Sequence, residues 1–295
     1  MNLIGHKKQK NLLTEMSGSG KIPHNLLFSG PEGVGKKRAA IEFIKTLNCK
    51  EDGCDECKAC KEIESGRHGD LMIIDEDEEI KIDQVREMQK RLSLTGMSKE
   101  SYKVAIINNA HLLNRQAQAC LLKTLEEPKG NALIILITDK PNTLLDTILS
   151  RMWSVKFSFV ETELIEKELL FRGADKDTAA ELAKLSFSKP GLAIRLFEDD
   201  EFRSKWIQKK DDLNRIRDSF LADRFDYVKK MAKDKEEARE TLKIWIGLLR
   251  REMLKSEEDV SKIKKSLEVM EDVLLLTSKT NVNFKLSLER VIINL

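Results

Sequence analysis

A glycine-rich stretch near the N-terminus has the spacing of a phosphate-binding loop. It follows the apolar run 25–29, and its glycines and lysine are Gly30, Gly33, Gly35 and Lys36. In such a loop the backbone N–H groups and the lysine bind a polyphosphate. The next position normally supplies a hydroxyl that binds Mg²⁺, but here it is Lys37, a cation that repels a metal ion. The stretch predicts a degenerate nucleotide site, with a ligand-free glycine turn as the alternative.

A second element of the nucleotide-site pattern also lacks its metal-binding residues. The apolar run 103–107 is typical of a strand buried in a parallel sheet, and it is followed by Asn108 and Asn109. A working site has carboxylates here, to hold the metal and polarise water. An amide carries no charge for Mg²⁺ and takes no proton from water. We therefore expect no Mg²⁺ and no intrinsic ATPase, while ATP binding stays open; two ordinary polar residues at a strand end are the alternative.

Four of the five cysteines gather in one short segment. They are Cys49, Cys54, Cys57 and Cys60. The spacing C-x₄-C-x₂-C-x₂-C lets four thiolates converge on one tetrahedral ion, as a structural Zn²⁺ site requires. The residues between them are turn-forming and polar, so the segment needs the metal to fold. An iron–sulfur cluster remains an alternative ligand, and disulfides are another in a chain without an export signal.

The elements that position these residues alternate between strands and helices. Predicted strands occupy residues 25–29, 71–75, 103–108, 133–138 and 154–158. With helices between them, they predict a parallel α/β sheet, and after residue 159 the pattern is helical throughout. We expect a P-loop-like domain at 1–159 with a zinc module at 49–60, a small helical lid at 160–199, and an all-α domain at 200–295.

Composition and charge narrow the possible classes of function. The chain has 295 residues, of which 41% are hydrophobic and 35% charged, and its net charge is +2. A balance so near neutral argues against autonomous DNA binding. The N-terminus lacks the apolar run of a signal peptide, and no stretch of about 18 apolar residues occurs. The sequence predicts a cytoplasmic protein that does not bind a membrane, with the acidic run 75–79 as a solvated loop.

Residues 23–157 resemble the delta-prime subunits of bacterial DNA polymerase III clamp loaders. The matching segments are 23–36, 69–71, 80–86, 121–128 and 144–151. The resemblance implies an AAA+ fold in which the subunit's own ATPase is degenerate. It also implies a zinc module inserted after the P-loop helix, which favours zinc over the other cysteine ligands. It further implies that the C-terminal helices form a collar that packs against other subunits, so we expect unburied apolar residues there.

The resemblance also assigns roles to single residues. The family's Ser-Arg-Cys signature is here Ser150-Arg151-Met152, which implies that Arg151 is an arginine finger for a neighbouring subunit's phosphate. A surface arginine without that role is the alternative. Thr138 resembles the first sensor, or else caps the end of its strand. The second-sensor segment matches only loosely, with Leu192 where the family has arginine.

These expectations predict a largely non-hydrolysing clamp-loader subunit of the DNA polymerase III holoenzyme. Its partners would be gamma/tau-like motor subunits and a delta-like subunit, with the sliding clamp and primed DNA reached through the complex. An active AAA+ motor subunit of a clamp loader is an alternative, against which Lys37, Asn108 and Asn109 count. A weaker alternative is a zinc-containing module that binds nucleic acid directly.

Overall fold

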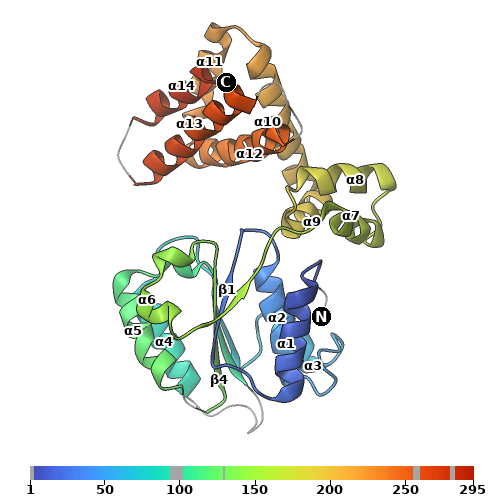
Figure 1. Ribbon diagram of the computed structural model, residues 1–295, viewed down its shortest axis with the longest axis vertical. Coiled ribbons are helices and arrows are strands. Elements are labelled where there is room, and N and C mark those ends of the chain that lie inside the picture. Colours follow the sequence, from blue (N-terminus) through green and yellow to red (C-terminus); the bar gives the residue numbers. More distant parts are fainter. Residues whose placement is uncertain (1–2, 94–101, 129, 255–259, 280–282) are drawn as a thin grey trace. The chain divides into compact units, whose positions relative to one another are not determined.

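The chain folds into two compact units, which are described separately. The computed structural model describes residues 3–93, 102–128, 130–254, 260–279 and 283–295 (Figure 1). The first unit is Met1–Ile194 and the second is Arg195–Leu295. Their boundary lies within helix α9 (Pro190–Glu198). The finer division into 1–159, 160–199 and 200–295 stays a prediction.

A five-stranded sheet forms the centre of the first unit. Its strands are β1 (Asn25–Ser29), β2 (Leu71–Ile74), β3 (Lys103–Ile107), β4 (Ala132–Thr138) and β5 (Trp153–Lys156). The order is β2-β3-β4-β1-β5, and every neighbouring pair is parallel. All carboxyl ends of the strands therefore share one edge of the sheet, and all amino ends share the other. This confirms the predicted parallel α/β fold.

Helices cover both faces of this sheet (Figure 1). They are α1 (Lys7–Ser19), α2 (Lys36–Asn48), α3 (Lys58–Glu64), α4 (Ile82–Ser93), α5 (Arg115–Glu126) and α6 (Asp146–Leu149). Alternation along β1 explains how both faces are filled: Leu26 and Phe28 join the core under α1 and α2, and Leu27 joins the core under α4, α5 and α6. A strand buried on both faces needs an unbroken apolar run, which β4 supplies, since all of its residues are buried.

Every regular element described beyond β5 is a helix, as the sequence predicts. In the first unit these helices are α7 (Thr162–Phe171) and α8 (Lys176–Leu185), followed by the start of α9. The second unit contains α10 (Asp200–Asp218), α11 (Leu221–Met231), α12 (Lys235–Met253), α13 (Val260–Lys279) and α14 (Phe284–Ile293). Its core includes Trp245, whose ring nitrogen donates to the backbone oxygen of Lys209 at 2.8 Å.

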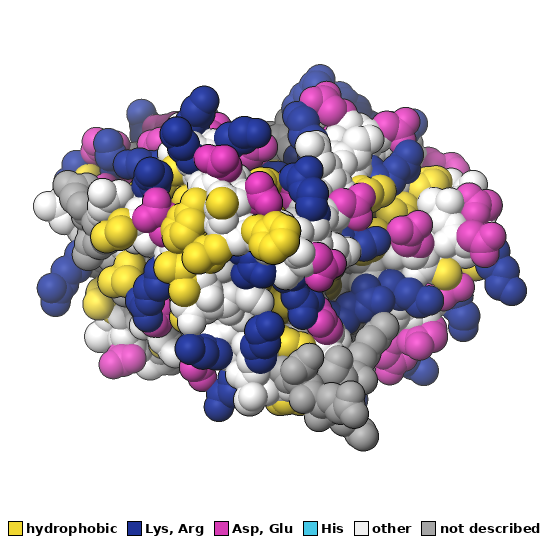
Figure 2. Space-filling model, turned by 90° about the horizontal axis from the view of Figure 1, so that it is seen from above, with side chains coloured by type: hydrophobic (Ala, Val, Ile, Leu, Met, Phe, Trp, Pro, Cys, Tyr) yellow, Lys and Arg dark blue, Asp and Glu magenta, His cyan; other side chains and the backbone are white. Residues whose placement is uncertain are grey.

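Several large apolar side chains of the second unit are exposed to solvent. They include Phe220, Leu254 and Leu286, which are 86%, 84% and 62% exposed. Figure 2 shows a face of the molecule on which hydrophobic side chains gather while basic and acidic side chains intersperse around them. That face presents no extended field of one sign, in line with the near-neutral net charge of +2. Among the described helices, none is long and apolar enough to cross a membrane.

Candidate functional site

The P-loop-like segment connects β1 to α2 at the carboxyl edge of the sheet. Lys36, the phosphate-binding lysine of the pattern, donates from Nζ to the backbone oxygens of Gly30 and Pro31, each at 2.6 Å. Burial of the side chain lowers the pKa of Lys36 below its ordinary value. The negative charges of Asp139 and Glu32 act in the opposite direction but do not outweigh burial. The lysine that would contact a phosphate therefore bonds to the loop's own backbone.

Lys37 and Asn108 converge on one carboxylate, that of Asp75. Lys37 forms an ion pair with Asp75 Oδ2, and Asn108 Nδ2 donates to Asp75 Oδ1 at 2.6 Å. Burial alone would raise the pKa of Asp75, but the bonds from Lys37 and Asn108 outweigh it and hold the pKa below its ordinary value. Asn109 donates to the backbone oxygen of Glu76 at 3.1 Å. The residues that replace metal-binding groups thus form a closed polar cluster.

Thr138 ends β4 beside this cluster. Its buried hydroxyl accepts from the backbone N–H of Lys140 at 3.0 Å, which is the contact expected of a strand-end cap. His111 Nδ1 lies 3.4 Å from that hydroxyl and 3.2 Å from Asp139 Oδ1. Burial lowers the pKa of His111 below its ordinary value, so the ring is neutral at pH 7 and the contact with Asp139 is not a salt bridge. A sensor role for Thr138 stays a prediction.

The start of α9 packs on the P-loop-like segment. Gly191 N donates to the backbone oxygen of Gly33 at 3.0 Å, and His6 Nε2 contacts the oxygen of Val34 at 2.9 Å. These contacts hold the loop from two sides. Leu192 follows in α9, so no arginine stands at the predicted second-sensor position.

The four clustered cysteines converge as the sequence predicts. The sulfurs of Cys49, Cys54, Cys57 and Cys60 all lie within 4.8 Å of one another. Cys49 Sγ is 3.6 Å from Cys54 Sγ and 3.7 Å from Cys57 Sγ, too far for a disulfide bond of about 2.05 Å. Four sulfurs at about 2.3 Å from a tetrahedral zinc ion are about 3.8 Å apart, so the spacing is consistent with a structural Zn²⁺ site.

Hydrogen bonds from backbone N–H groups lower the pKa of one of these thiols. Burial alone would raise the pKa of Cys49, but hydrogen bonds from the backbone around Cys54, Glu51 and Gly53 outweigh it and lower that pKa. Burial raises the pKa of Cys60. Since a metal binds the thiolate, loading of the site releases protons from the thiols that still carry them.

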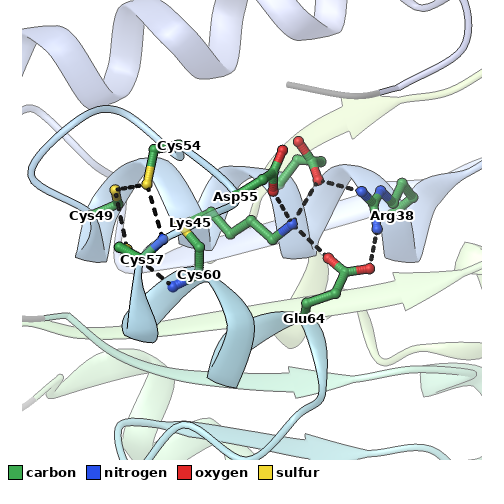
Figure 3. Close-up of polar contacts among 9 residues, drawn as sticks. Arg38, Lys45, Cys49, Cys54, Asp55, Cys57, Cys60 and Glu64 are labelled. Carbon is green, nitrogen blue, oxygen red and sulfur yellow. Dashed lines mark hydrogen bonds and ion pairs between the residues drawn. The ribbon is translucent and has the colours of Figure 1, made fainter.

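A buried lysine joins the cysteine segment to helix α2 (Figure 3). The side chain of Lys45 is 3% exposed, and its Nζ lies 3.2 Å from Glu42 and 2.5 Å from both Asp55 and Glu64. Arg38 pairs with Glu42 at 2.8 Å and also with Glu64. Burial alone would lower the pKa of Lys45, but its carboxylate partners outweigh it and raise that pKa above its ordinary value. These charged contacts therefore hold the module to α2.

Arg151 lies at the opposite, amino edge of the sheet, two residues before β5 begins. Its Nη2 is 2.7 Å from Glu126 Oε1, and its Nη1 donates to the backbone oxygen of Thr147 at 2.8 Å. The side chain is 36% exposed. Arg151 thus shares no edge of the sheet with the P-loop-like segment of its own chain.

The structure divides the predicted residues into three groups. The P-loop glycines, Lys36, Lys37, the two asparagines and Thr138 lie at the carboxyl edge, the cysteines form their own cluster, and Arg151 stands apart. Asp75, Lys45 and Glu126 were not predicted. A signal existed for Asp75, because it directly follows a buried strand whose carboxyl end must reach this edge. The sequence contains no comparable signal for Lys45 or Glu126.

Comparison with known proteins places the chain in a family. A family model described as DNA polymerase III, delta subunit, matches residues 5–161. DNA polymerase III subunit delta' of Bacillus subtilis is 36% identical over 186 residues, which are 62% of this chain and 56% of that protein. Subunit tau of the same organism is 38% identical over 149 residues, 49% of this chain and 26% of that protein.

The chain thus matches just over half the length of the delta' relative and about a quarter of the tau relative. A gamma subunit-related protein of Thermotoga maritima has a solved structure with a TM-score of 0.49 and 19% identity, covering 95% of this chain and 97% of that one. The family model covers more than half of the 295 residues. The chain therefore belongs to the DNA polymerase III delta subunit family of clamp-loader proteins.

Proposed function

We propose that this chain is a non-hydrolysing clamp-loader subunit that supplies Arg151 to the ATP site of a neighbouring subunit. Its own P-loop-like segment serves as a rigid structural element, and its four cysteines hold a structural Zn²⁺ ion. The observation that best supports the proposal is the placement of Arg151 at the edge of the sheet opposite to the P-loop-like segment.

That placement favours action on another molecule. Strand β1 has five residues, so at about 3.3 Å per residue its ends are roughly 13 Å apart. Asn25, at its amino end, bonds to the backbone oxygen of Arg151, and the P-loop-like segment begins after its carboxyl end. An arginine side chain reaches roughly 7 Å from its Cα, given bonds of about 1.5 Å. Arg151 therefore does not reach its own loop, and a phosphate that it contacts belongs to a neighbour.

The contacts at the carboxyl edge support the absence of hydrolysis. A phosphate would have to compete with two backbone oxygens for Lys36 and would face the carboxylate of Asp139. Lys37 stands where a hydroxyl would bind Mg²⁺, and Asn108 and Asn109 replace the carboxylates that would hold it. The substitutions remove the hydroxyl and the carboxylates that the pattern uses, and the nearby carboxylate of Asp75 is already bonded to Lys37 and Asn108.

The cysteine geometry supports zinc over the alternative ligands. In a multi-iron cluster the thiolates bind different irons, so the sulfurs must stand farther apart than around a single ion. Here all four lie within 4.8 Å, which suits one ion and a closed shell. Because a closed shell leaves no open coordination position, the metal would stabilise the fold and take no part in a reaction.

The relatives indicate which class of protein is expected to bind this chain. The proteins most similar to this chain include both a delta' and a tau subunit of DNA polymerase III, so resemblance alone does not choose between a silent subunit and a motor. The residues at the carboxyl edge favour the silent subunit. We therefore propose that gamma/tau-like motor subunits and a delta-like subunit surround this chain, and that the complex carries it to the sliding clamp and primed DNA.

ATP hydrolysis by the reconstituted complex tests the proposal. Wild-type chain, Arg151→Ala and Arg151→Lys are each mixed with the motor subunits and DNA, and rapid-quench measurements count the fast-hydrolysing sites. We expect the alanine variant to assemble and to lose one fast site per copy of this chain, because an arginine finger contributes about 10³-fold or more to kcat. Lysine should restore little, since it lacks the planar fork.

Controls separate the proposal from its alternative. Arg91→Ala removes another exposed arginine with a carboxylate partner, Glu87, and should leave hydrolysis unchanged. The chain without its partners should not hydrolyse ATP in the presence of Mg²⁺. Turnover by the chain alone, or full activity of the complex with Arg151→Ala, would refute the proposed function.

A further inference from the structure

We infer that Glu126 is the positioning residue for Arg151 and holds its guanidinium ready for the neighbour's phosphate. The inference rests on the proposed function and adds a second residue to it. Glu126 ends α5 and Arg151 follows α6, so the two residues reach the amino edge of the sheet from different helices.

Contacts on both arms of the guanidinium fix its orientation. Glu126 Oε1 lies 2.7 Å from Nη2, and on the other arm Nη1 donates to the backbone oxygen of Thr147 at 2.8 Å and to Ser150 Oγ at 3.3 Å. The arginine side chain is 36% exposed and that of Glu126 is 50% exposed. The pair is therefore ordered by the chain itself while it stays open to an approaching molecule.

A buried asparagine fixes the backbone under this pair. Asn25 is 8% exposed, and its Nδ2 donates to the backbone oxygen of Leu125 at 2.9 Å and to that of Arg151 at 3.3 Å. One amide group thus links the residue before Glu126 to Arg151. Because the two backbone segments are joined, the fold holds the two charged residues within reach of each other.

Preorganisation gives this contact a function. A free arginine loses rotamer entropy when it binds a phosphate, and a donor that is oriented beforehand avoids part of that loss at the moment of reaction. An exposed ion pair contributes only modestly, so Glu126 is expected to tune the rate by a few fold. Because this pairing is weak, the guanidinium can leave the carboxylate of Glu126 and rotate toward a more highly charged phosphate.

The test compares Glu126→Gln with Glu127→Gln in the full complex. Glutamine keeps the size of the side chain and removes its charge, and Glu127 is the adjacent exposed glutamate. We expect Glu126→Gln to lower hydrolysis at the site completed by Arg151 by about two- to fivefold. Glu127→Gln should stay close to wild type, and the conservative Glu126→Asp, which keeps the charge on a shorter side chain, should recover part of the lost rate. The affinity of this chain for the motor subunits, measured by analytical ultracentrifugation, should not change.

A double-mutant cycle distinguishes positioning from a purely structural effect. In the Arg151→Ala background, Glu126→Gln should have no further effect on hydrolysis, because the group that it orients is gone. An additive loss, an increase in hydrolysis, or no change in the single variant would overturn the role of Glu126. If Arg151→Ala itself leaves hydrolysis intact, the proposed function and this inference fall together, whereas an effect of Arg151 without one of Glu126 removes only the inference.

Discussion

The two edges of the central sheet differ in how they place the cation that the sequence pattern assigns to a phosphate. At the carboxyl edge that cation, Lys36, is buried and bonded to two backbone oxygens, while its neighbour Lys37 is 47% exposed and paired with Asp75. At the amino edge Arg151 is also paired, yet its side chain is 36% exposed and its carboxylate partner 50% exposed. One edge thus has the sequence pattern of a nucleotide site and a buried, internally bonded lysine, while the other presents an arginine at the surface.

This difference bears on why a phosphate-loop pattern would persist in a chain that we propose does not hydrolyse ATP. The loop glycines meet needs of the fold, since Gly30 has a φ of 142° and lies against the backbone of Phe157. Substitutions at the carboxyl edge should therefore reduce the stability of the chain. Substitutions at the amino edge should mainly reduce ATP hydrolysis at the site of a neighbouring subunit.

The largest effect is expected for Gly30→Ala. A Cβ at Gly30 would lie 2.2 Å from the backbone oxygen of Phe157, at a φ that residues with a side chain rarely adopt. Relief requires the backbone of two strands to move, so the free energy of unfolding should fall by about 4 kcal/mol. Chemical denaturation measures this loss.

Gly18→Ala is the matched control for that variant. Gly18 lies inside α1 with no atom near its added Cβ, so alanine should stabilise the chain by about 0.5–1 kcal/mol through helix propensity. If Gly30→Ala were as stable as wild type, the loop glycine would not be retained for packing, and a ligand-binding role would be favoured instead.

A smaller loss of stability is expected for Lys45→Met. The variant leaves Glu42, which is 3% exposed, with Arg38 but without Lys45, and it releases Asp55 from α2, while Glu64 keeps only its pair with Arg38. Breaking a buried ion pair costs about 3–5 kcal/mol, and the half-exposed partners place this case near 3 kcal/mol. Thermal unfolding of the zinc-loaded chain provides the measurement.

Lys58→Met provides the comparison within the same module. Lys58 is 89% exposed and lies 3.7 Å from Glu62, so its loss should cost less than about 0.5 kcal/mol. Equal effects of the two variants would mean that the Lys45 network does not fasten the module to α2. Removal of the metal by a chelator should unfold residues 49–64 first, and Lys45→Met should make that step easier.

The elements of the sheet could be predicted because their signal is local. Four of the five strands both begin and end within a residue of the predicted range, since an apolar run closed by polar residues defines a buried strand. The fifth, β5, was predicted at 154–158 and spans Trp153–Lys156, because an edge strand is half exposed and has a weaker pattern. The cysteine cluster was equally predictable, because the ligands of one ion are close in sequence.

The polar partners could not be predicted, because their signal is not local. Asn25 bonds to residues 100 and 126 positions away, and Glu126 meets Arg151 only because two helices end at one edge of the sheet. Periodicity shows which face of an element is buried but does not show which charged group stands opposite. The acidic run 75–79 illustrates the limit: it is an exposed loop, as predicted, but the sequence did not indicate that Asp75 pairs with Lys37.

Asn25→Ala tests whether the amino edge is built as proposed. The variant removes two hydrogen bonds to backbone oxygens, but it also removes Asn25 Oδ1, a buried acceptor without a partner. The two effects oppose each other, so the free energy of unfolding should fall by only about 1 kcal/mol. Asn25→Asp should cost more, since it directs a carboxylate at two carbonyl oxygens. Denaturation of both variants measures this order, and the reverse order would show that the amide does not link the two segments.

Asp75→Asn should have the smallest effect, and its dependence on pH makes it informative. The pKa of Asp75 is lower in the folded chain than its unfolded value of about 3.9, so its contribution to stability is present above about pH 5 and is lost as the pH falls through the folded pKa. Asp75 is 36% exposed, which limits that contribution to less than about 1 kcal/mol. Wild type should exceed Asp75→Asn in stability at pH 7, and the two should converge near pH 2. A difference that persists at low pH would mean that the asparagine disturbs packing, and the ion pair with Lys37 would then not be what closes this edge of the sheet.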